Sequence, residues 1–236
     1  MLEVCVDTLE GAVIAIESGA QRIELSENLV VGGVTPSTDL IEAVRASCGE
    51  SLIVLVRCRA GDFKYRNEEL RRMIDQASEA IGLGADGVAI GASLEDCSLD
   101  WGFLIEAHRA VKSVSQAASL VVHRVFDQVP DPMVSIERLI QIGYDRILTS
   151  GGAEQAVGSL DALRRWQIAT ADRLEILPAG GVHSGNAQWI LESTGCRQLH
   201  GSFTRTAAGQ VSRMPDRDEI AKVRRVLDGF CLASQG

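Results

Sequence analysis

The feature that most constrains the fold is an eightfold alternation of short apolar segments with longer segments of helical periodicity along the 236 residues. Short runs rich in Val, Ile and Leu are typical of parallel strands buried on both faces. The phrase Leu83-Gly84-Ala85-Asp86 precedes such a run, and two similar phrases recur elsewhere, as a repeated helix-to-strand turn requires. The predicted strands are residues 2–6, 22–25, 52–59, 87–90, 119–126, 146–149, 174–177 and 198–200. The predicted helices are residues 9–18, 67–81, 101–114, 132–143, 160–169, 186–193 and 218–232, with another beginning after Ser37.

Eight strand–helix units in a chain of this length favour a TIM barrel near the small end of its size range. The alternative is a doubly wound sheet, which usually has fewer strands and carries a glycine-rich nucleotide fingerprint after its first strand. The first predicted strand leads instead into Asp7-Thr8-Leu9-Glu10-Gly11, which lacks that fingerprint. We therefore predict an α/β fold, a (β/α)8 TIM barrel that forms a single domain over residues 1–236.

The amino-acid composition limits which binding partners and which cellular setting are expected. A formal net charge of −9 argues against general binding of nucleic acid or anionic membranes. The six cysteines show no C-x-x-C spacing, so they indicate neither a zinc site nor a disulfide framework but reduced thiols. No stretch resembles a signal peptide, and no apolar run approaches the ~20 residues of a membrane span. A cytoplasmic protein is expected.

Polar residues gather where the predicted strands end. In a TIM barrel the functional groups lie at the carboxyl ends of the strands, and the opposite turns contribute mainly stability. A ring of carboxylates, guanidinium groups and imidazoles at that end is suited to acid–base chemistry. The candidate acid–base residues are Glu3, Glu24, His123 and Asp127. The candidate residues for binding a substrate or anion are Arg57, Arg59, Asp62, Arg124, Ser150, Gly180, Gly181, His200 and Ser202.

Two of these features point to an anion. Arg57 and Arg59, two residues apart on a predicted strand, are expected on the same side of it, and buried charges need a partner or a ligand. The Gly180-Gly181 turn after the seventh strand is expected to expose backbone N–H groups where TIM barrels often hold phosphate. A structural explanation remains open for each: salt bridges for the arginines, close packing for the glycines.

A purely structural explanation is also open for Glu3 and His123. Glu3 is equally explained by pairing with an arginine in a buried network, and His123 by a satisfied position in the core. Among the cysteines, only Cys5, Cys58 and Cys97 are placed where they could approach the mouth of the barrel. A soft thiolate site for Cu(I) needs at least two sulfur atoms, and one cysteine alone is more often a small buried residue.

The chain resembles the CutC copper-homeostasis family across nearly its whole length. The matching motifs follow one another in order and come from most of the predicted strand ends. They are Leu2-Glu3-Val4-Cys5-Val6-Asp7, Arg22-Ile23-Glu24-Leu25, Gly32-Gly33-Val34-Thr35-Pro36-Ser37, Arg57-Cys58-Arg59-Ala60-Gly61-Asp62-Phe63-Lys64-Tyr65, His123-Arg124-Val125-Phe126-Asp127, Leu148-Thr149-Ser150-Gly151, Gly180-Gly181-Val182 and His200-Gly201-Ser202.

The resemblance implies a TIM barrel, cytoplasmic copper handling, self-association, and Cu(I) bound by cysteines of the first two strands. Cys5 matches the first of those cysteines, whereas Ser26 stands at the second position. Cys58 and Ala60 also depart from the family's third-strand motif, where proline and glycine are usual. Whether Cys58 or Cys97 replaces the thiol missing at Ser26 depends on the fold.

Two functions are therefore expected. The first is copper homeostasis, with Cu(I) bound at the mouth of the barrel by Cys5 together with another thiol or a histidine. The alternative is a barrel enzyme that acts on a small anionic or phosphorylated substrate. In the alternative, Arg57, Arg59 and the loops after the seventh and eighth strands hold the anion, and the carboxylates and His123 move protons.

Overall fold

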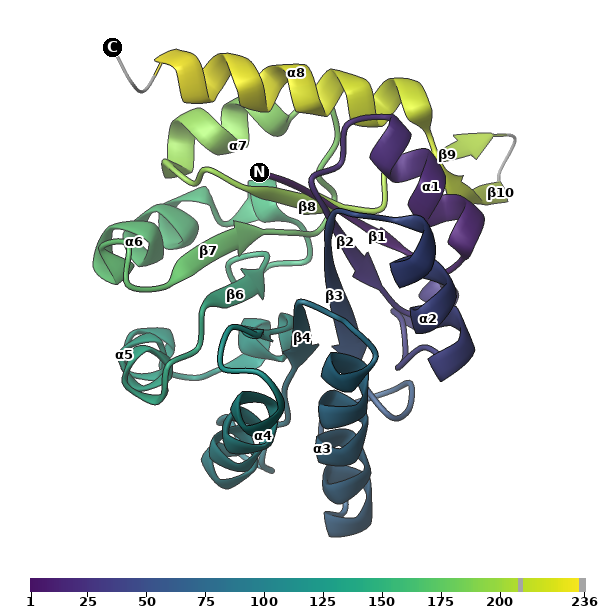
Figure 1. Ribbon diagram of the computed structural model, residues 1–236. Helices are drawn as coiled ribbons and strands as arrows, with labels where there is room; N and C mark the ends of the chain where they lie inside the picture. Colours follow the sequence, from purple (N-terminus) through teal and green to yellow (C-terminus); the bar gives the residue numbers. More distant parts are fainter. Residues whose placement is uncertain (208–209, 234–236) are drawn as a thin grey trace.

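Eight parallel strands form a nearly closed barrel in the computed structural model, which describes residues 1–207 and 210–233 (Figure 1). Hydrogen-bonded neighbours run in the order β7-β6-β5-β4-β3-β2-β1-β8, so the strands from β1 to β7 pair with their neighbours in sequence and β1 also pairs with β8. The strands are β1 (Leu2–Val6), β2 (Arg22–Leu25), β3 (Ser51–Val56), β4 (Gly87–Ile90), β5 (Ser119–Val122), β6 (Arg146–Thr149), β7 (Glu175–Pro178) and β8 (Leu199–Gly201). The predicted barrel is confirmed.

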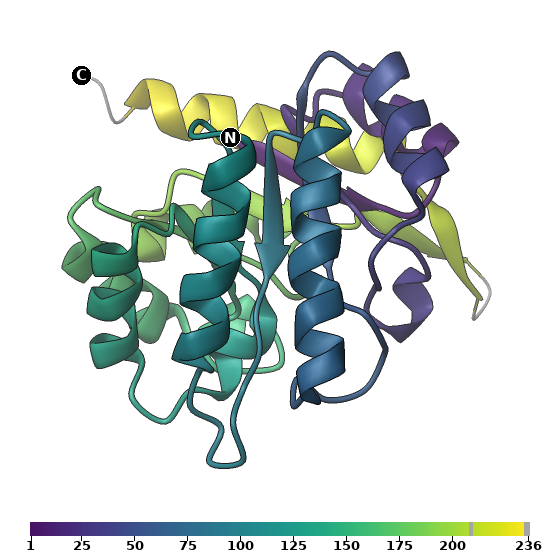
Figure 2. The same ribbon diagram turned by 60° about the horizontal axis from the view of Figure 1, so that its bottom comes forward.

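Helices surround the strands, and Figure 2 shows α3 and α4 side by side on the outside of the barrel. They are α1 (Leu9–Glu17), α2 (Thr38–Ser47), α3 (Asn67–Gly82), α4 (Trp101–Val114), α5 (Pro132–Ile142), α6 (Leu160–Thr170), α7 (Ala187–Thr194) and α8 (Arg217–Ala233). Three short 3-10 helices lie in the loops: η1 (Leu29–Val31), η2 (Arg124–Gln128) and η3 (Ala156–Gly158).

Helix α5 shows how local sequence sets the boundaries. The Asp131 side chain accepts a hydrogen bond from the Val134 N–H at 3.2 Å, and Pro132 takes the first helical position. Gly143 ends the helix with φ 98°, a left-handed conformation that favours glycine. The turn predicted from the recurring glycine phrases is therefore present.

The structure differs from the prediction at three places. Strand β3 ends at Val56 rather than at residue 59, and β5 ends at Val122, followed by the 3-10 helix η2. A hairpin of β9 (Thr204–Ala207) and β10 (Gln210–Pro215), which was not predicted, separates β8 from α8. Hydrophobic periodicity does not reveal these features, because extended backbone and a paired strand leave the same apolar pattern in a short segment.

The interior of the barrel is divided into an apolar and a polar half. A small buried cluster from β3 to β7 fills one half: Ile53, Leu55, Ala89, Val121, Leu148, Leu177 and Ala179. The neighbouring strands β8, β1 and β2 and the residue just before β8 carry instead buried polar or ionisable side chains: Glu3, Cys5, Arg22, Glu24, Gln198 and His200. A larger hydrophobic core packs the outer faces of the strands against the helices. In the described part of the chain, no helix is both long and apolar enough to cross a membrane.

Candidate functional site

A cavity of about 510 Å³ opens at the carboxyl ends of the strands, where a TIM barrel places its functional groups. Its volume lies within the range of small-molecule sites. Side chains from both halves of the barrel and from the loops above it form the walls. They are Cys5, Glu24, Leu29, Val30, Gly32, Leu55, Arg57, Phe63, His123, Arg124, Leu148, His200, Ser202 and Thr204.

Strand register brings the polar side chains of this cavity together. In the parallel pairing of β1 with β2, Cys5 lies opposite Glu24 and Glu3 lies opposite Arg22. In the pairing of β1 with β8, Glu3 lies opposite His200. Because alternate residues of a strand face the same side, these five side chains share the interior of the barrel on three adjacent strands.

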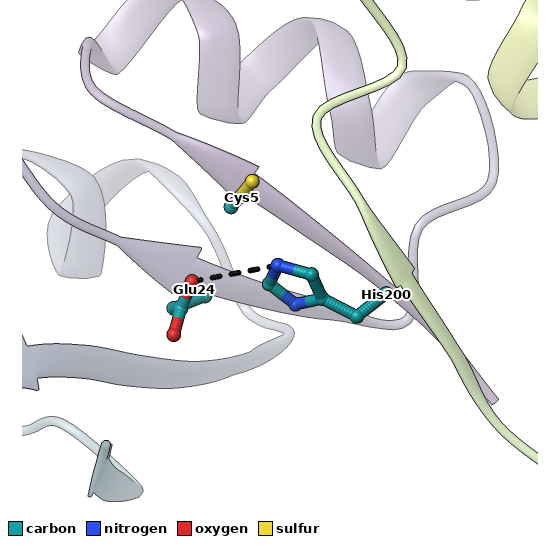
Figure 3. A group of neighbouring side chains, drawn as sticks. All are labelled: Cys5, Glu24 and His200. Carbon is teal, nitrogen blue, oxygen red and sulfur yellow. Dashed lines mark ion pairs between the residues drawn. The ribbon is translucent and has the colours of Figure 1, made fainter. Parts of the chain in front are cut away.

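Cys5, Glu24 and His200 converge on one point. One ligand atom from each, the Cys5 sulfur, a Glu24 oxygen and a His200 nitrogen, lies within 4.8 Å of the other two, and all three residues are buried. The His200 Nε2 atom is 3.7 Å from the Glu24 Oε2 atom (Figure 3). Sulfur, nitrogen and oxygen donors at such separations are able to surround a single metal ion.

Glu3 holds His200 of this group in position through the ring nitrogen that faces away from Glu24. Its carboxylate is buried, pairs with the Arg22 guanidinium, and lies 2.7 Å from the His200 Nδ1 atom. Burial alone would raise the pKa of Glu3, but Arg22 and His200 more than offset it and lower the pKa to about 2. Arg22 also donates a hydrogen bond of 2.6 Å to the Gln198 side-chain oxygen. The Glu3 carboxylate is therefore ionised and its partners fix its position.

Glu24 and His200 have strongly shifted pKa values. Burial, with a further contribution from the charge of Glu3, raises the pKa of Glu24 to about 7. Burial would lower the pKa of His200, but Cys5, Glu24 and Glu3 around the ring raise it well above its usual value. Near neutral pH the pair thus holds protons that a bound cation would displace.

His123 is neutral, in contrast to His200. Burial, together with the charge of Arg57, lowers the pKa of His123 to about 3. Its Nδ1 atom accepts a hydrogen bond from the Val125 N–H at 3.2 Å, and its ring lies 4.9 Å from that of Phe63. The Nε2 atom has no partner among the described residues. The sequence left open that His123 is a core residue with all its hydrogen bonds made. The structure supplies a partner for Nδ1 but none, among the described residues, for Nε2.

Arg57 and Arg59 do not act as a matched pair, because β3 ends before them. Arg57 is buried and lines the cavity, where its guanidinium donates to backbone carbonyls of the loops above. Arg59 is not among the lining residues, and it contacts Glu69 and Asp62 at 2.8 and 3.0 Å. Strand alternation applies only within the strand, so it no longer supports the expectation that both arginines face one side, and their joint binding role stays a prediction.

Asp127 and Arg124 form a structural junction between β5 and β6. Asp127 accepts hydrogen bonds from Thr149 Oγ1, from the N–H and hydroxyl groups of Ser150, from the Gly152 N–H and from Arg124. Arg124 also donates to the Ser150 hydroxyl at 2.8 Å and lines the cavity. These bonds satisfy Asp127 fully, so its acid–base role stays a prediction that the geometry does not favour.

The glycine turn after β7 lies apart from the cavity walls. Gly180 and Gly181 have φ values of 88° and 67°, as the predicted turn requires, but neither is among the lining residues. A Cβ on Gly181 would come within 2.8 Å of the Gln155 side chain, which matches the close-packing explanation. Ser202, after β8, does line the cavity. The phosphate role of the turn stays a prediction.

The remaining thiols do not complete a sulfur pair. Ser26 is fully buried, and a Cβ on Gly33 in the loop above would come within 3.1 Å of its Oγ atom. Cys58 packs against the outer hydrophobic core, and neither Cys58 nor Cys97 joins the metal-ligating group found among residues 1–207 and 210–233. Instead of a second thiol, the described structure offers Cys5 one carboxylate and one imidazole.

The sequence-based site missed Arg22 and Gln198. Both are buried behind His200 and hold the Glu3 carboxylate or its partner in place. The signal for Arg22 was present in the sequence, since Arg22 and Glu24 are two residues apart on one predicted strand and must share a face. Gln198 carries the same signal, since it lies two residues before His200 on the predicted strand 198–200.

The profile of the CutC family matches residues 1–205. The chain belongs to the CutC family. The human copper homeostasis protein cutC homolog is 36% identical over 206 residues, which cover 87% of this chain and 74% of the human protein. A CutC family protein of Rhizobium meliloti is 38% identical over 232 residues, covering 96% of this chain and 91% of its own.

A solved CutC structure from Streptococcus agalactiae confirms the fold. It superposes with a TM-score of 0.78 at 31% identity and covers 86% of this chain and 98% of the solved one. The CutC resemblance drawn from the motifs is thereby confirmed, and with it membership of a family named for copper homeostasis.

Proposed function

We propose that this CutC protein binds a copper ion at the mouth of its barrel, through Cys5, His200 and Glu24. The observation that carries the proposal is the convergence of their sulfur, nitrogen and oxygen atoms within 4.8 Å inside a cavity. The family name supports copper as the metal. Cys5 supplies the thiolate expected from the sequence, and His200 and Glu24 stand in for the thiol missing at Ser26.

The three ligands do not suit copper equally well. A thiolate and an imidazole suit Cu(I), whereas a carboxylate is a harder ligand and suits divalent ions. We therefore expect Cys5 and His200 to hold Cu(I), with Glu24 beside them as a weaker third donor. Glu3 supports this arrangement, because it holds the Nδ1 atom of His200 at 2.7 Å and leaves Nε2 directed towards Glu24. A carboxylate on the other ring nitrogen is the usual support of a metal-ligating histidine.

The proposal includes a cytoplasmic setting. All six cysteines are free, and a Cu(I) site built on one thiolate requires the reduced state that the cytoplasm maintains. Self-association, implied by the family resemblance, is part of the same proposal and bears on the site only if a second copy covers the cavity.

The test is an anaerobic titration of the reduced protein with Cu(I) against a competing chelator. We expect binding of one ion per chain, lost in Cys5→Ala and kept in Cys48→Ala, which removes another buried thiol outside the cavity. Glu24→Gln separates the metals: Cu(I) affinity should change little, whereas affinity for Zn²⁺, which takes carboxylate readily, should fall. Equal and weak Cu(I) binding by wild type and Cys5→Ala would overturn the proposal.

A second function is favoured by the size of the cavity. About 510 Å³ is far more than one ion occupies, and the walls include the buried cation of Arg57. We propose as the alternative an enzyme that acts on a small anionic substrate, with Glu24 and His200 as the proton-transfer pair. This function predicts binding of a small anion that is lost in Arg57→Ala and unaffected by Cys5→Ala.

A further inference from the structure

Two buried polar side chains on the cavity wall take no part in the proposed metal site. His123, next to the carboxyl end of β5, and Arg57, just after β3, both line the cavity, and 97% and 94% of their respective surfaces are buried. Buried polar groups almost always have hydrogen-bond partners, and a group without one calls for an explanation. A ligand that enters the cavity would supply that partner.

His123 presents a hydrogen-bond donor without an acceptor. Because its Nδ1 atom accepts the N–H of Val125 at 3.2 Å, the neutral ring carries its proton on Nε2. Nε2 is buried and has no partner within residues 1–207 and 210–233. The lowered pKa of His123, about 3, keeps the ring neutral and the N–H in place throughout the neutral range.

The backbone is shaped to admit this ring. Gly91, after β4, lies so close that a Cβ there would come within 3.2 Å of the His123 Cε1 atom and 2.5 Å of a Val125 methyl group. Phe63 packs on the ring from the β3 loop at 4.9 Å between centroids. The ring is therefore held in one orientation, with its free N–H at a fixed position.

Arg57 adds a positive charge that no carboxylate balances in the described part of the chain. Its guanidinium donates to the carbonyls of Val31, Gly33 and Gly61, which are neutral acceptors, and lies 5.1 Å from the centre of the Phe63 ring. These bonds engage both Nη groups, whereas the buried Nε atom has no partner among the described residues, and none of the bonds balances the charge. A buried cation without a counterion is costly, and an anion in the cavity would remove that cost.

The other walls are mostly apolar. Leu29 and Val30 from η1, Leu55, Leu148 and Phe63 surround the space. Such a lining accepts a compact apolar body. The other donors on the wall are Arg124, whose guanidinium already contacts Asp127 and Ser150, and the hydroxyl groups of Ser202 and Thr204. A phosphate monoester, with three terminal oxygens and up to two charges, needs several N–H groups, and the glycine turn after β7 that could supply them is not on the wall.

We propose that the cavity binds a small organic carboxylate, whose carboxylate oxygen accepts a hydrogen bond from His123 Nε2–H beside the Arg57 charge. The apolar part of the ligand packs against Leu55, Leu148 and Phe63, with its far side near Glu24 and His200. The inference rests on the second proposed function, a site for a small anion, and names its chemical class. It is independent of metal binding by Cys5.

The test uses benzoate as the probe and benzamide as its uncharged match. Calorimetry on the full chain should show saturable benzoate binding. Benzamide should bind more weakly by about tenfold or more, because its neutral carbonyl replaces the charged acceptor of benzoate. His123→Asn retains an acceptor near Nδ1 for the Val125 N–H but loses the donor at Nε2. It should weaken benzoate by a similar factor, and His123→Gln, whose amide reaches further, should restore part of the affinity.

A direct readout covers the case in which a variant does not fold. In the wild-type protein, benzoate should shift the imidazole nitrogen resonances of His123, and benzamide should shift them less. Binding of benzoate and benzamide with equal affinity, or shifts confined to other residues, would overturn the inference.

The controls separate failure of the proposed anion site from failure of the carboxylate class alone. If inorganic phosphate binds and benzoate does not, the anion site stands and the carboxylate class is wrong. If neither binds at millimolar concentration, the anion function itself fails along with the inference. Cys48→Ala, which removes a buried thiol outside the cavity, should bind benzoate like wild type.

Discussion

The Nδ1 atom of His200 lies 2.7 Å from the Oε1 atom of Glu3, across the pairing of the last barrel strand with the first. This contact is buried, and Arg22 on β2 completes it from the other side of Glu3. Three neighbouring strands are thus joined by charges inside the barrel, while the opposite half is filled by aliphatic side chains. The same contact orients the imidazole towards Cys5 and Glu24, so closure of the barrel and assembly of the candidate site depend on one carboxylate.

Glu3→Gln should destabilise the protein strongly. The variant leaves the buried guanidinium of Arg22 without its counterion, and breaking a buried pair costs about 3–5 kcal/mol. Because the folded pKa of Glu3 is about 2 against an ordinary 4.5, this contribution is complete above about pH 4.5 and is lost as the pH falls towards 2. Urea unfolding at several pH values measures it.

The matched control is Glu137→Gln. It breaks an exposed ion pair with Arg173, whose atoms are 3.1 Å apart, and should cost less than about 1 kcal/mol. Equal losses in the two variants would show that the buried network contributes no more than a surface pair.

Glu24→Gln should stabilise the metal-free protein increasingly as the pH rises. The folded pKa of Glu24 is about 7 against an ordinary 4.5, so the wild type loses stability between these values and the loss levels off above them. Glutamine carries no such cost, and its advantage should reach about 1 to 3 kcal/mol above pH 7 and vanish near pH 4. Unfolding curves across this range, with Glu10→Gln as an exposed control for loss of charge, measure the effect. A constant difference at all pH values would contradict it.

Copper affinity should rise with pH around neutrality. Metal ligands bind in their deprotonated forms, and the pKa values of His200 and Glu24 are both raised, so binding must release protons. For each proton released, the apparent affinity should increase about tenfold per pH unit. Calorimetry in buffers of different ionisation enthalpy counts the protons. Binding without proton release would exclude His200 as a ligand.

Gly91→Ala should destabilise the protein by about 1–3 kcal/mol and displace His123. The new methyl group would lie 2.5 Å from Val125 and 3.2 Å from the imidazole, and neither side chain is free to move aside. Gly82→Ala at the end of α3, where nothing lies within 4 Å, should instead be neutral or stabilise by up to about 1 kcal/mol. Thermal unfolding compares the two, and the benzoate affinity of Gly91→Ala reports on His123.

Much of the fold was readable from local sequence. The alternation of apolar runs with helical patterns is a repeated local signal, and caps such as Asp131 and Gly143 mark the ends of helices without reference to distant residues. The hairpin of β9 and β10 and the early end of β3 were not readable, since pairing partners and strand ends depend on neighbours far along the chain. The early end of β3 is why Arg57 reaches the cavity and Arg59 does not.

The sequence by itself determined that strands and helices alternate eight times along the chain, because that alternation follows from local periodicity. It named Glu3, Cys5 and Glu24 as candidate site residues, and the structure pairs Glu3 and Cys5 of β1 with Arg22 and Glu24 of β2. Only the tertiary structure decided which of them meet. The pairing of β1 with β8 joins residues 197 positions apart and brings His200 to Glu3. The surroundings then set the charge of each histidine. The pKa of His200 is raised beside carboxylates, so it is a cation, whereas the pKa of His123 is lowered beside Arg57, so it is a neutral donor. Such pKa shifts arise from burial and nearby charges, which no local pattern records.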